Sequence, residues 1–527
     1  MPTEKNRGER AGENISFWER TAQKFYTAPL SENVTAHVCV IGAGIAGVTT
    51  AYLAAREGRD VVLIDDGPVG GGMTGRTTAH LVNALDDRYF EVEKMLGEES
   101  ARLYAESHTA AIDQVEAIVA KEKINCKFER LDGYLFLPPG GSVTELKREL
   151  EATHRAGLIG VERIEAMPIG KLNTDGVLRF PRQAQFHPLD YVNGLARAIV
   201  DLGGRIFTGT RAIKISDGDR VKIETADGHT VTARAAVVAT NCPINDRLVI
   251  HSKQAPYATY VIGMRVTREV EHALFWDTAL TAEEEKQKIG PVPYHYVRFA
   301  RDEAGEVLIV GGEDHKTGQA SDFEQRFAKL ERWTRDHFPF VGEITDRWSG
   351  QVMEPVDGVA YIGRNPGDKN VYVVSGDSGN GITHGTIAGM LIVDLICDRE
   401  NPWAKLYDPA RKTLKPIVVA DYVAENANVA AQFRDYVTPG DTASAGEIKP
   451  GDGAILREGS KKIAAYRDDN GSLHKFSAVC PHLRCVVRWD DCEKTWDCPC
   501  HGSRFDALGR VLNGPAISDL EALDTPT

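Results

Sequence analysis

Two short loops near the end of the chain, each carrying one cysteine and one histidine, constrain this sequence more than any other feature. The first loop reads Cys480-Pro-His482, and fifteen residues later the second reads Cys498-Pro-Cys-His501. A [2Fe–2S] cluster with mixed ligands needs two thiolates on one iron and two neutral imidazoles on the other. The two loops together supply that set, and such a cluster moves one electron at a time. Zinc prefers the same sulfur and nitrogen ligands, so a zinc site remains open at this point.

The stretch from 480 to 506 resembles the Rieske iron–sulfur proteins of the cytochrome bc type. It reads Cys-Pro-His-Leu-Arg-Cys in the first loop, and Cys-Pro-Cys-His-Gly-Ser-Arg-Phe-Asp from the second loop onward. The resemblance implies that the two cysteines and two histidines above hold one Rieske [2Fe–2S] cluster. It also implies a disulfide between Cys485 and Cys500. The later Gly514-Pro515-Ala516 is similar to the proline loop that covers the cluster in this family.

Two positions depart from the Rieske pattern. The family usually has glycine where this chain has Arg484, so the backbone there is strained or a charge is placed near the cluster surface. High-potential members carry a tyrosine where this chain has Phe505, so one hydroxyl donor to a cluster thiolate is missing. Because hydrogen bonds to sulfur raise the potential, we expect a value below the upper Rieske limit of about +300 mV.

Length and composition exclude several classes of protein. A chain of 527 residues predicts two to four domains. No run of eighteen apolar residues occurs, so no transmembrane segment is expected, and residues 1–14 lack the apolar core of a signal peptide. A net charge of −14 argues against nonspecific nucleic-acid binding. Five of the nine cysteines lie between 480 and 500 and the rest are scattered, which favours a cytoplasmic protein.

A second redox centre is indicated near the other end of the chain. A β-branched run from 37 to 41 leads directly into Gly42-Ala-Gly44-Ile-Ala-Gly47, followed by a helical pattern and a second apolar strand that ends at Asp65. In a βαβ nucleotide site the first glycine makes the turn, the second admits a pyrophosphate and the third lets helix and strand pack closely. The helix N-terminus faces the phosphates, and Asp65 falls where an acid binds a ribose hydroxyl.

Three later segments favour FAD over NAD. They are an apolar strand ending in Ala-Thr at 237–241, a Trp-Ser-Gly to Tyr-Ile-Gly stretch at 348–363, and a glycine-rich turn at 376–383 that opens an apolar helix. Their order over about 36–400 resembles the D-amino-acid oxidase/glycine oxidase/sarcosine oxidase family of FAD enzymes. In that family the last turn starts a helix whose N-terminal amides face the flavin. The candidate FAD-binding residues are Gly42, Ala43, Gly44, Ile45, Gly47, Asp65, Asp66, Thr74, Thr77, Thr78, Ala212, Thr240, Gly379, Asn380, Gly381, Ile382 and Thr383.

The loop from 70 to 80 matches a family segment that runs past the flavin. Some members attach FAD covalently through a histidine there, and Arg76 takes that place in this chain. The resemblance therefore implies non-covalent FAD. We expect the nearby His80 to make a structural hydrogen bond rather than a flavin link.

The expected fold class is an α/β FAD-binding domain of the glutathione-reductase-like Rossmann type, interleaved with an α+β antiparallel-sheet substrate domain and followed by a small all-β Rieske domain. The two subdomains of the oxidoreductase part, 36–400, are expected to thread through each other, as in the family. The expected ranges are an N-terminal arm 1–35, FAD-binding segments about 36–100, 183–255 and 345–400, substrate-domain segments about 101–182 and 256–344, a connector 401–445, and a Rieske domain 446–527.

Nearly the whole chain resembles bacterial FAD-dependent oxidoreductases with C-terminal Rieske domains, whose substrates are largely unassigned. That resemblance supports the architecture more than the reaction. The two redox centres together favour dehydrogenation of an amine or amino acid at the flavin, with electrons passing singly through the cluster to an external protein or quinone. Candidate polar groups near substrate or flavin are Tyr260, His315 and Lys316, each of which has an ordinary structural role as its alternative. No arginine clamp for a carboxylate is evident, so amine and amino acid both remain open.

Three other functions remain open from sequence. The chain could be an amine oxidase that uses O₂, with a structural or regulatory cluster. Electrons could instead enter through the cluster and reduce a substrate at the flavin. It could also be a non-enzymatic electron carrier or redox sensor. The direction of electron flow, the physiological electron partner, the reaction with O₂ and the oligomeric state are not fixed by the sequence.

Overall fold

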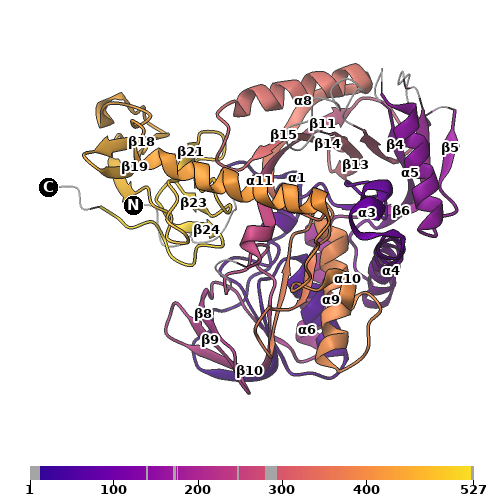
Figure 1. The fold of residues 1–527 in the computed structure, drawn as a ribbon, viewed down its shortest axis with the longest axis horizontal. Helices are drawn as coiled ribbons and strands as arrows, with labels where there is room; N and C mark the ends of the chain where they lie inside the picture. The colour runs from indigo at the N-terminus through magenta and orange to yellow at the C-terminus, as the bar shows by residue number, and fades with distance from the viewer. Residues whose placement is uncertain are drawn as a thin grey trace.

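The computed structural model describes residues 12–137, 141–165, 167–169, 174, 176–245, 249–278 and 294–523. Figure 1 shows two large lobes, one around β10, α6 and α9 and one around β11, β13 and β14, with a small β-rich lobe at the C-terminal end. The helix α11 (Pro416–Gln432) runs from the large lobes to the small one.

The first lobe is built on an eight-stranded sheet with β1 (Val34–Ile41) near its centre. The main path has the order β16-β17-β10-β1-β2-β7, and β1 pairs in parallel with both β2 and β10. Each position of β2 is buried, as is usual in parallel sheets. The other strands are β2 (Val61–Ile64), β7 (Arg205–Phe207), β8 (Ala212–Ser216), β9 (Val221–Thr225), β10 (Thr230–Val238), β16 (Tyr361–Arg364) and β17 (Val371–Ser375).

Helix α2 (Ile45–Arg56) connects β1 to β2 and packs against α9 (Gly381–Ile396). The two helices approach closely because α9 carries glycines on the contact face. A Cβ at Gly389 would lie 2.7 Å from the Thr49 side chain. The remaining helices before the small lobe are α1 (Phe17–Thr21), η2 (Met73–Gly75), α3 (Tyr89–Leu96), α4 (Glu98–Glu122), α5 (Val143–Arg155), α6 (Pro188–Asp201), η3 (His251–Lys253), α8 (Phe323–His337) and α10 (Ala404–Tyr407).

The second lobe contains a nine-stranded, mostly antiparallel sheet of order β15-β11-β14-β13-β12-β4-β6-β3, with β5 beside β6. Helix α8 covers one face, where its Phe327 meets Tyr260 of β11 edge to face. The strands are β3 (His80–Leu81), β4 (Glu129–Phe136), β5 (Glu162–Ile164), β6 (Val177–Gln185), β11 (Gln254–Val266), β12 (Leu274–Asp277), β13 (Tyr296–Asp302), β14 (Gly305–Lys316) and β15 (Val341–Pro355).

The small lobe follows α11 and consists of two short antiparallel sheets. The three-stranded sheet contributes Ile455 and Phe476 to the hydrophobic cluster of this lobe. The four-stranded sheet carries the two Cys/His loops. The elements are η4 (Phe433–Tyr436), η5 (Ala445–Glu447), β18 (Asp452–Glu458), β19 (Lys461–Arg467), β20 (Leu473–Ser477), β21 (Arg488–Asp490), β22 (Thr495–Asp497), β23 (Arg504–Asp506) and β24 (Val511–Asn513).

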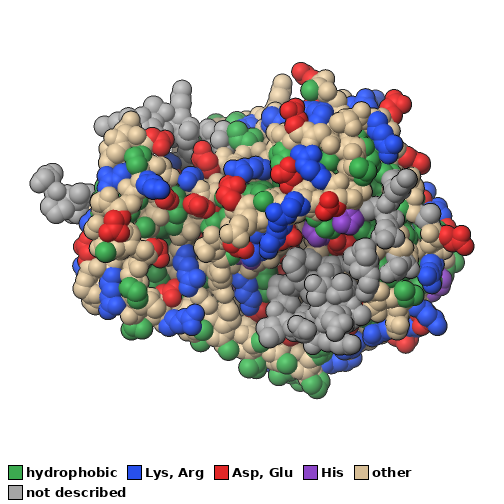
Figure 2. Space-filling view, turned by 90° about the horizontal axis from the view of Figure 1, so that it is seen from above, with side chains coloured by type: hydrophobic (Ala, Val, Ile, Leu, Met, Phe, Trp, Pro, Cys, Tyr) green, Lys and Arg blue, Asp and Glu red, His purple; other side chains and the backbone are tan. Residues whose placement is uncertain are grey.

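The architecture confirms the expected fold class. Helix α4 packs on α9 of the first lobe, although its sequence position falls in the segment that we assigned to the substrate domain. The described part of the N-terminal arm, residues 12–35, is anchored, because Trp18 is buried and its indole N–H donates to the Thr77 carbonyl at 2.6 Å. None of the described helices is both long and apolar enough to cross a membrane. Figure 2 shows acidic and basic side chains interspersed over the face that it presents.

Candidate functional site

The turn between β1 and α2 has the close packing that a nucleotide site requires. Gly42 has a φ of +104°, and a Cβ on Gly47 would collide with the Gly42 carbonyl. The Ala43 N–H donates to Asp65 Oδ2 at 2.5 Å, and the Gly67 N–H donates to Asp65 Oδ1 at 2.7 Å. These bonds fix the Asp65 carboxylate at the end of β2, next to the start of α2.

A cavity of about 290 Å³ opens at this turn and extends to the sheet of the second lobe. Both α2 and α9 begin at its wall, and neither N-cap residue makes a side-chain capping bond. The Ile45 N–H of α2 donates to Thr74 Oγ1 at 3.0 Å, but both helices still direct the positive end of their dipole at the cavity. This fits a long anionic dinucleotide. The expected residues that line the cavity are Gly42, Gly44, Ile45, Asp65, Asp66, Thr74, Thr77, Thr78, Ala212, Thr240, Gly379, Asn380, Gly381 and Ile382.

Three other expected residues lie behind this wall. Ala43 holds Asp65, Gly47 packs on the turn, and the Thr383 hydroxyl donates to the Val82 carbonyl at 3.3 Å. They support the lining rather than forming it.

Arg76 and His80 both lie on the loop that faces the cavity, and both have protein partners. The buried Arg76 guanidinium contacts Glu493 Oε1 of the small lobe at 2.6 Å and donates through Nε to the Ser349 carbonyl at 2.5 Å. His80 contacts Thr78 Oγ1 through Nδ1 and the Val297 carbonyl through Nε2. Burial lowers the pKa of His80 to about 3, so the ring is neutral.

The sheet of the second lobe forms the opposite wall. Thr259 and Val261 of β11 line the cavity, whereas Tyr260 between them points to α8, because successive side chains of a strand face opposite ways. The same alternation turns Asp314 of β14 to the cavity and His315 to the α8 side, where its ring stacks on Tyr260 at 5.7 Å.

The three polar candidates from sequence therefore lie outside the cavity lining. Tyr260 and His315 pack under α8, and Lys316 pairs with Glu425 of α11. Sequence reasoning missed the four carboxyl groups that do line this end: Asp86, Asp314, Glu354 and Asp377. Asp314 is the immediate neighbour of His315, so strand alternation alone could have identified it.

These four carboxyl groups are strongly perturbed. Burial raises the pKa of Asp86 to about 7 and those of Asp314 and Asp377 to about 6. Burial and the nearby Asp87 raise the pKa of Glu354 well above its usual range. Such shifts cluster at functional sites because a buried charge needs a partner.

The two Cys/His loops of the small lobe lie together. The His482 and His501 rings are 5.0 Å apart between centroids, and the Cys480 and Cys498 thiols are buried and free. Two thiols and two imidazoles side by side fit the donor set of a Rieske cluster. The Ala516 N–H of the proline loop donates to Ser503 Oγ at 3.0 Å, which ties that loop to the second ligand loop.

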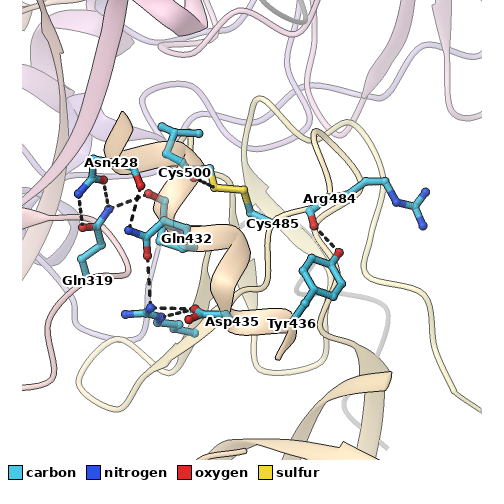
Figure 3. The surroundings of a disulfide bond; sticks show 11 residues. Gln319, Asn428, Gln432, Asp435, Tyr436, Arg484, Cys485 and Cys500 are labelled. Atoms are coloured by element: carbon cyan, nitrogen blue, oxygen red, sulfur yellow. Dashed lines mark hydrogen bonds and ion pairs between the residues drawn. A yellow bond between two sulfur atoms is a disulfide. The ribbon is translucent and has the colours of Figure 1, made fainter. Parts of the chain in front are cut away.

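Cys485 and Cys500 form the expected disulfide, shown in Figure 3 beside the end of α11. Arg484, next to this bond, has a φ of +67°, in the left-handed region that favours glycine. Its side chain extends away from the other residues drawn, while its carbonyl accepts a hydrogen bond from the Tyr436 hydroxyl at 2.5 Å.

The small lobe is docked on the side of the first lobe that holds the nucleotide cavity. His251 of η3 lies with its ring 4.9 Å from that of His482 and 5.9 Å from that of His501. Cys242 Sγ lies 3.8 Å from the His501 carbonyl oxygen, and Gln351 Nε2 donates to the Gly502 carbonyl at 2.9 Å. The histidine edge of the ligand loops thus faces the other lobe.

One segment of the small lobe also belongs to the cavity wall. Val511, Leu512, Asn513, Gly514, Ala516 and Ile517 line it together with Thr240 and Asn241. The proline loop, expected to cover the cluster, therefore also closes the nucleotide cavity.

Two family models match the chain. The model described as "FAD dependent oxidoreductase" matches residues 37–395, and the Rieske [2Fe-2S] domain model matches residues 440–524. The matched ranges contain the nucleotide turn with its cavity and the two Cys/His loops, respectively. FAD and a Rieske cluster are therefore the cofactors.

Two curated relatives are similar to all or to part of this chain. The putative Rieske 2Fe-2S iron-sulfur protein YhfW of Bacillus subtilis is 31% identical over 97% of both chains. The gamma-glutamylputrescine oxidoreductase of Escherichia coli is 26% identical over 72% of this chain and 88% of its own.

Solved structures share the fold of the two large lobes. Glycine oxidase from Geobacillus kaustophilus has a TM-score of 0.57 at 16% identity, covering 72% of this chain and 100% of its own. L-amino acid deaminase from Proteus myxofaciens has a TM-score of 0.58 at 14% identity, covering 77% and 100%.

Proposed function

The chain belongs to the FAD-dependent oxidoreductase family and ends in a Rieske [2Fe–2S] domain, and from this premise we propose that it dehydrogenates an amine or amino acid and delivers the electrons singly to an external acceptor. The substrate C–H bond next to nitrogen would lose a hydride, leaving an iminium that water hydrolyses. The two electrons taken from the substrate would then pass one at a time through the cluster to an acceptor protein or quinone. A relative named for gamma-glutamylputrescine supports a nitrogen-containing substrate.

The residues of this chain have distinct tasks in that reaction. The α2 turn would hold the pyrophosphate of FAD, and Asp65 a ribose hydroxyl. The N-terminus of α9 would favour negative charge at the flavin edge. Bound FAD would supply hydride acceptance, and the cluster would supply single-electron transfer. The sheet wall at Thr259 and Val261 excludes water from the face opposite α2.

The observation that supports electron transfer between the two centres is the wall that their sites share. Segment 511–517 lines the FAD cavity, and Cys242 joins the cavity residues Thr240 and Asn241 to the His501 loop. Because the cluster domain is docked on the flavin cavity through buried contacts, an internal transfer needs no domain movement. We also propose a cytoplasmic location, supported by Cys39, Cys126, Cys242 and Cys397, which form no disulfide in the described part of the chain.

Anaerobic stopped-flow mixing with a panel of amines and amino acids tests this function. We expect loss of oxidised-flavin absorbance followed by reduction of the cluster. Cys242→Ala is expected to slow the second phase and not the first, and Cys397→Ala, on the far end of α9, is the matched control. In air, rapid peroxide release with an oxidised cluster would instead identify an O₂-using oxidase.

A further inference from the structure

We propose that the substrate carries a second positive charge, as in a diamine or polyamine, and that Asp86 and Asp314 bind its remote ammonium group in the flavin cavity. This inference rests on the amine dehydrogenation proposed above and names the substrate class of that site. It also decides between amine and amino acid.

The two carboxyl groups lie where the cavity meets the second lobe. Asp86 accepts a hydrogen bond from the Tyr294 hydroxyl, and a Cβ on Gly379 would collide with Asp86 Oδ2. Gly379 belongs to the turn that opens α9, so Asp86 lies at the flavin end of the cavity. Asp314 faces the same cavity from β14.

Asp314 supplies an independent sign that a ligand is missing. Its Oδ1 is buried, and no residue in the described part of the chain gives that atom a hydrogen bond. An unsatisfied buried carboxylate oxygen costs free energy, and an ammonium group in the cavity would offset that cost.

The remaining wall suits the carbon chain of such a substrate. The Tyr294 and Tyr296 rings lie 5.4 Å apart and line the cavity with Trp276. Aromatic faces attract cations and accommodate methylene groups. The acidic groups therefore stand beside an apolar channel rather than on open surface.

The cations of the described lining are occupied elsewhere. Arg76 pairs with Glu493, and Arg211 pairs with Asp66 and Asp519 at the nucleotide end. Burial lowers the pKa of His80 to about 3 and that of His384, the other lining histidine, to about 4, so both rings are neutral. A substrate carboxylate would find no free arginine among these lining residues, and the acidic groups around it offer no cationic partner.

Three ligands of one chain length test the inference: cadaverine with two ammonium groups, pentylamine with one, and δ-aminovalerate with one ammonium and one carboxylate. Binding is measured by anaerobic calorimetry on the holoprotein after dithionite reduction, so that no dehydrogenation can occur. We expect cadaverine to bind at least about tenfold more tightly than pentylamine, and δ-aminovalerate to bind most weakly.

Asp314→Asn is expected to weaken cadaverine binding about tenfold, and Asp86→Asn is the second variant. Asp219→Asn, whose side chain is fully exposed on the first lobe, is the matched control and is expected to change nothing. Flavin and cluster absorbance show that each variant holds its cofactors. If a variant loses a cofactor, the comparison of the three ligands on the unaltered protein still tests the inference.

Equal binding of cadaverine and pentylamine, or tight binding of δ-aminovalerate, would overturn the inference. If cadaverine binds selectively but no amine bleaches the oxidised flavin, the dehydrogenase proposal fails and the charge selectivity stands. If an amino acid bleaches the flavin while cadaverine binds no better than pentylamine, the dehydrogenase proposal stands and the selectivity fails.

Discussion

Replacing Glu493 by glutamine tests the buried contact that joins the Rieske domain to the flavin loop. Glu493 Oε1 accepts hydrogen bonds from Arg76 at 2.6 Å and from the N–H and hydroxyl of Ser349 at 2.8 and 2.7 Å. Burial alone would raise the pKa of Glu493, but Arg76 and Arg504 hold it below its usual range. Glutamine keeps the shape and removes the charge, which leaves the buried Arg76 guanidinium with only the more distant Glu19 carboxylate, 3.8 Å away, as a counterion.

Breaking a buried ion pair in this way typically costs about 3–5 kcal/mol. We expect the apparent free energy of unfolding to fall by that amount in a urea titration followed by tryptophan fluorescence, because Trp18, Trp348 and Trp496 are fully buried. Glu99→Gln disrupts an exposed ion pair with Arg102 and is the control, and it should not change the urea midpoint of unfolding. If Glu493→Gln lowers the free energy of unfolding no more than the control does, the Arg76–Glu493 pair does not stabilise the contact between the two domains.

Three further predictions concern single side chains. Burial lowers the pKa of His295, but Asp277 at 2.7 Å and Glu313 outweigh burial and raise that pKa to about 9. The ion pair therefore stabilises the fold fully below the unfolded pKa of about 6.5, and about 3 kcal/mol of that stability is lost as pH rises through 9. His295→Gln should remove this pH dependence from the urea midpoint of unfolding. Arg484→Gly should relieve the left-handed backbone and stabilise by roughly 1 kcal/mol at most, and a lower melting temperature would contradict this. Ser503→Ala removes a hydroxyl that hydrogen-bonds the Cys480 sulfur. The reduction potential of the cluster, measured by redox titration, should fall by on the order of 50–100 mV. An unchanged potential would exclude that hydrogen bond.

Features fixed by short stretches of sequence were predictable. The βαβ unit around Gly42 depends on local turn and packing rules, and the two Cys/His loops depend on ligand spacing, so a dinucleotide site and a metal or cluster site could be predicted from the residues. The choice of FAD and of a Rieske cluster, and the full fold class, depended on family resemblance. The disulfide between Cys485 and Cys500 came from family resemblance rather than from the residues themselves.

Features that depend on distant segments were not predictable. The Arg76–Glu493 pair spans 417 residues, and no local pattern marks either partner. Asp86 reaches the cavity only because β3 and α9 come together. Asp314 differs from these cases, because the alternation of side chains along β14 places it on the cavity face and its neighbour His315 on the opposite face.

The loop 511–517 has a consequence for how the protein is made in cells. Because this loop closes the FAD cavity and is tied to the ligand loop through Ser503, we expect a missing cluster to weaken the retention of FAD. Cells starved of iron would produce polypeptide that retains flavin poorly, even though the flavin domain itself contains no iron ligand. The flavin content of purified protein is therefore an index of how completely iron–sulfur assembly has kept pace with synthesis.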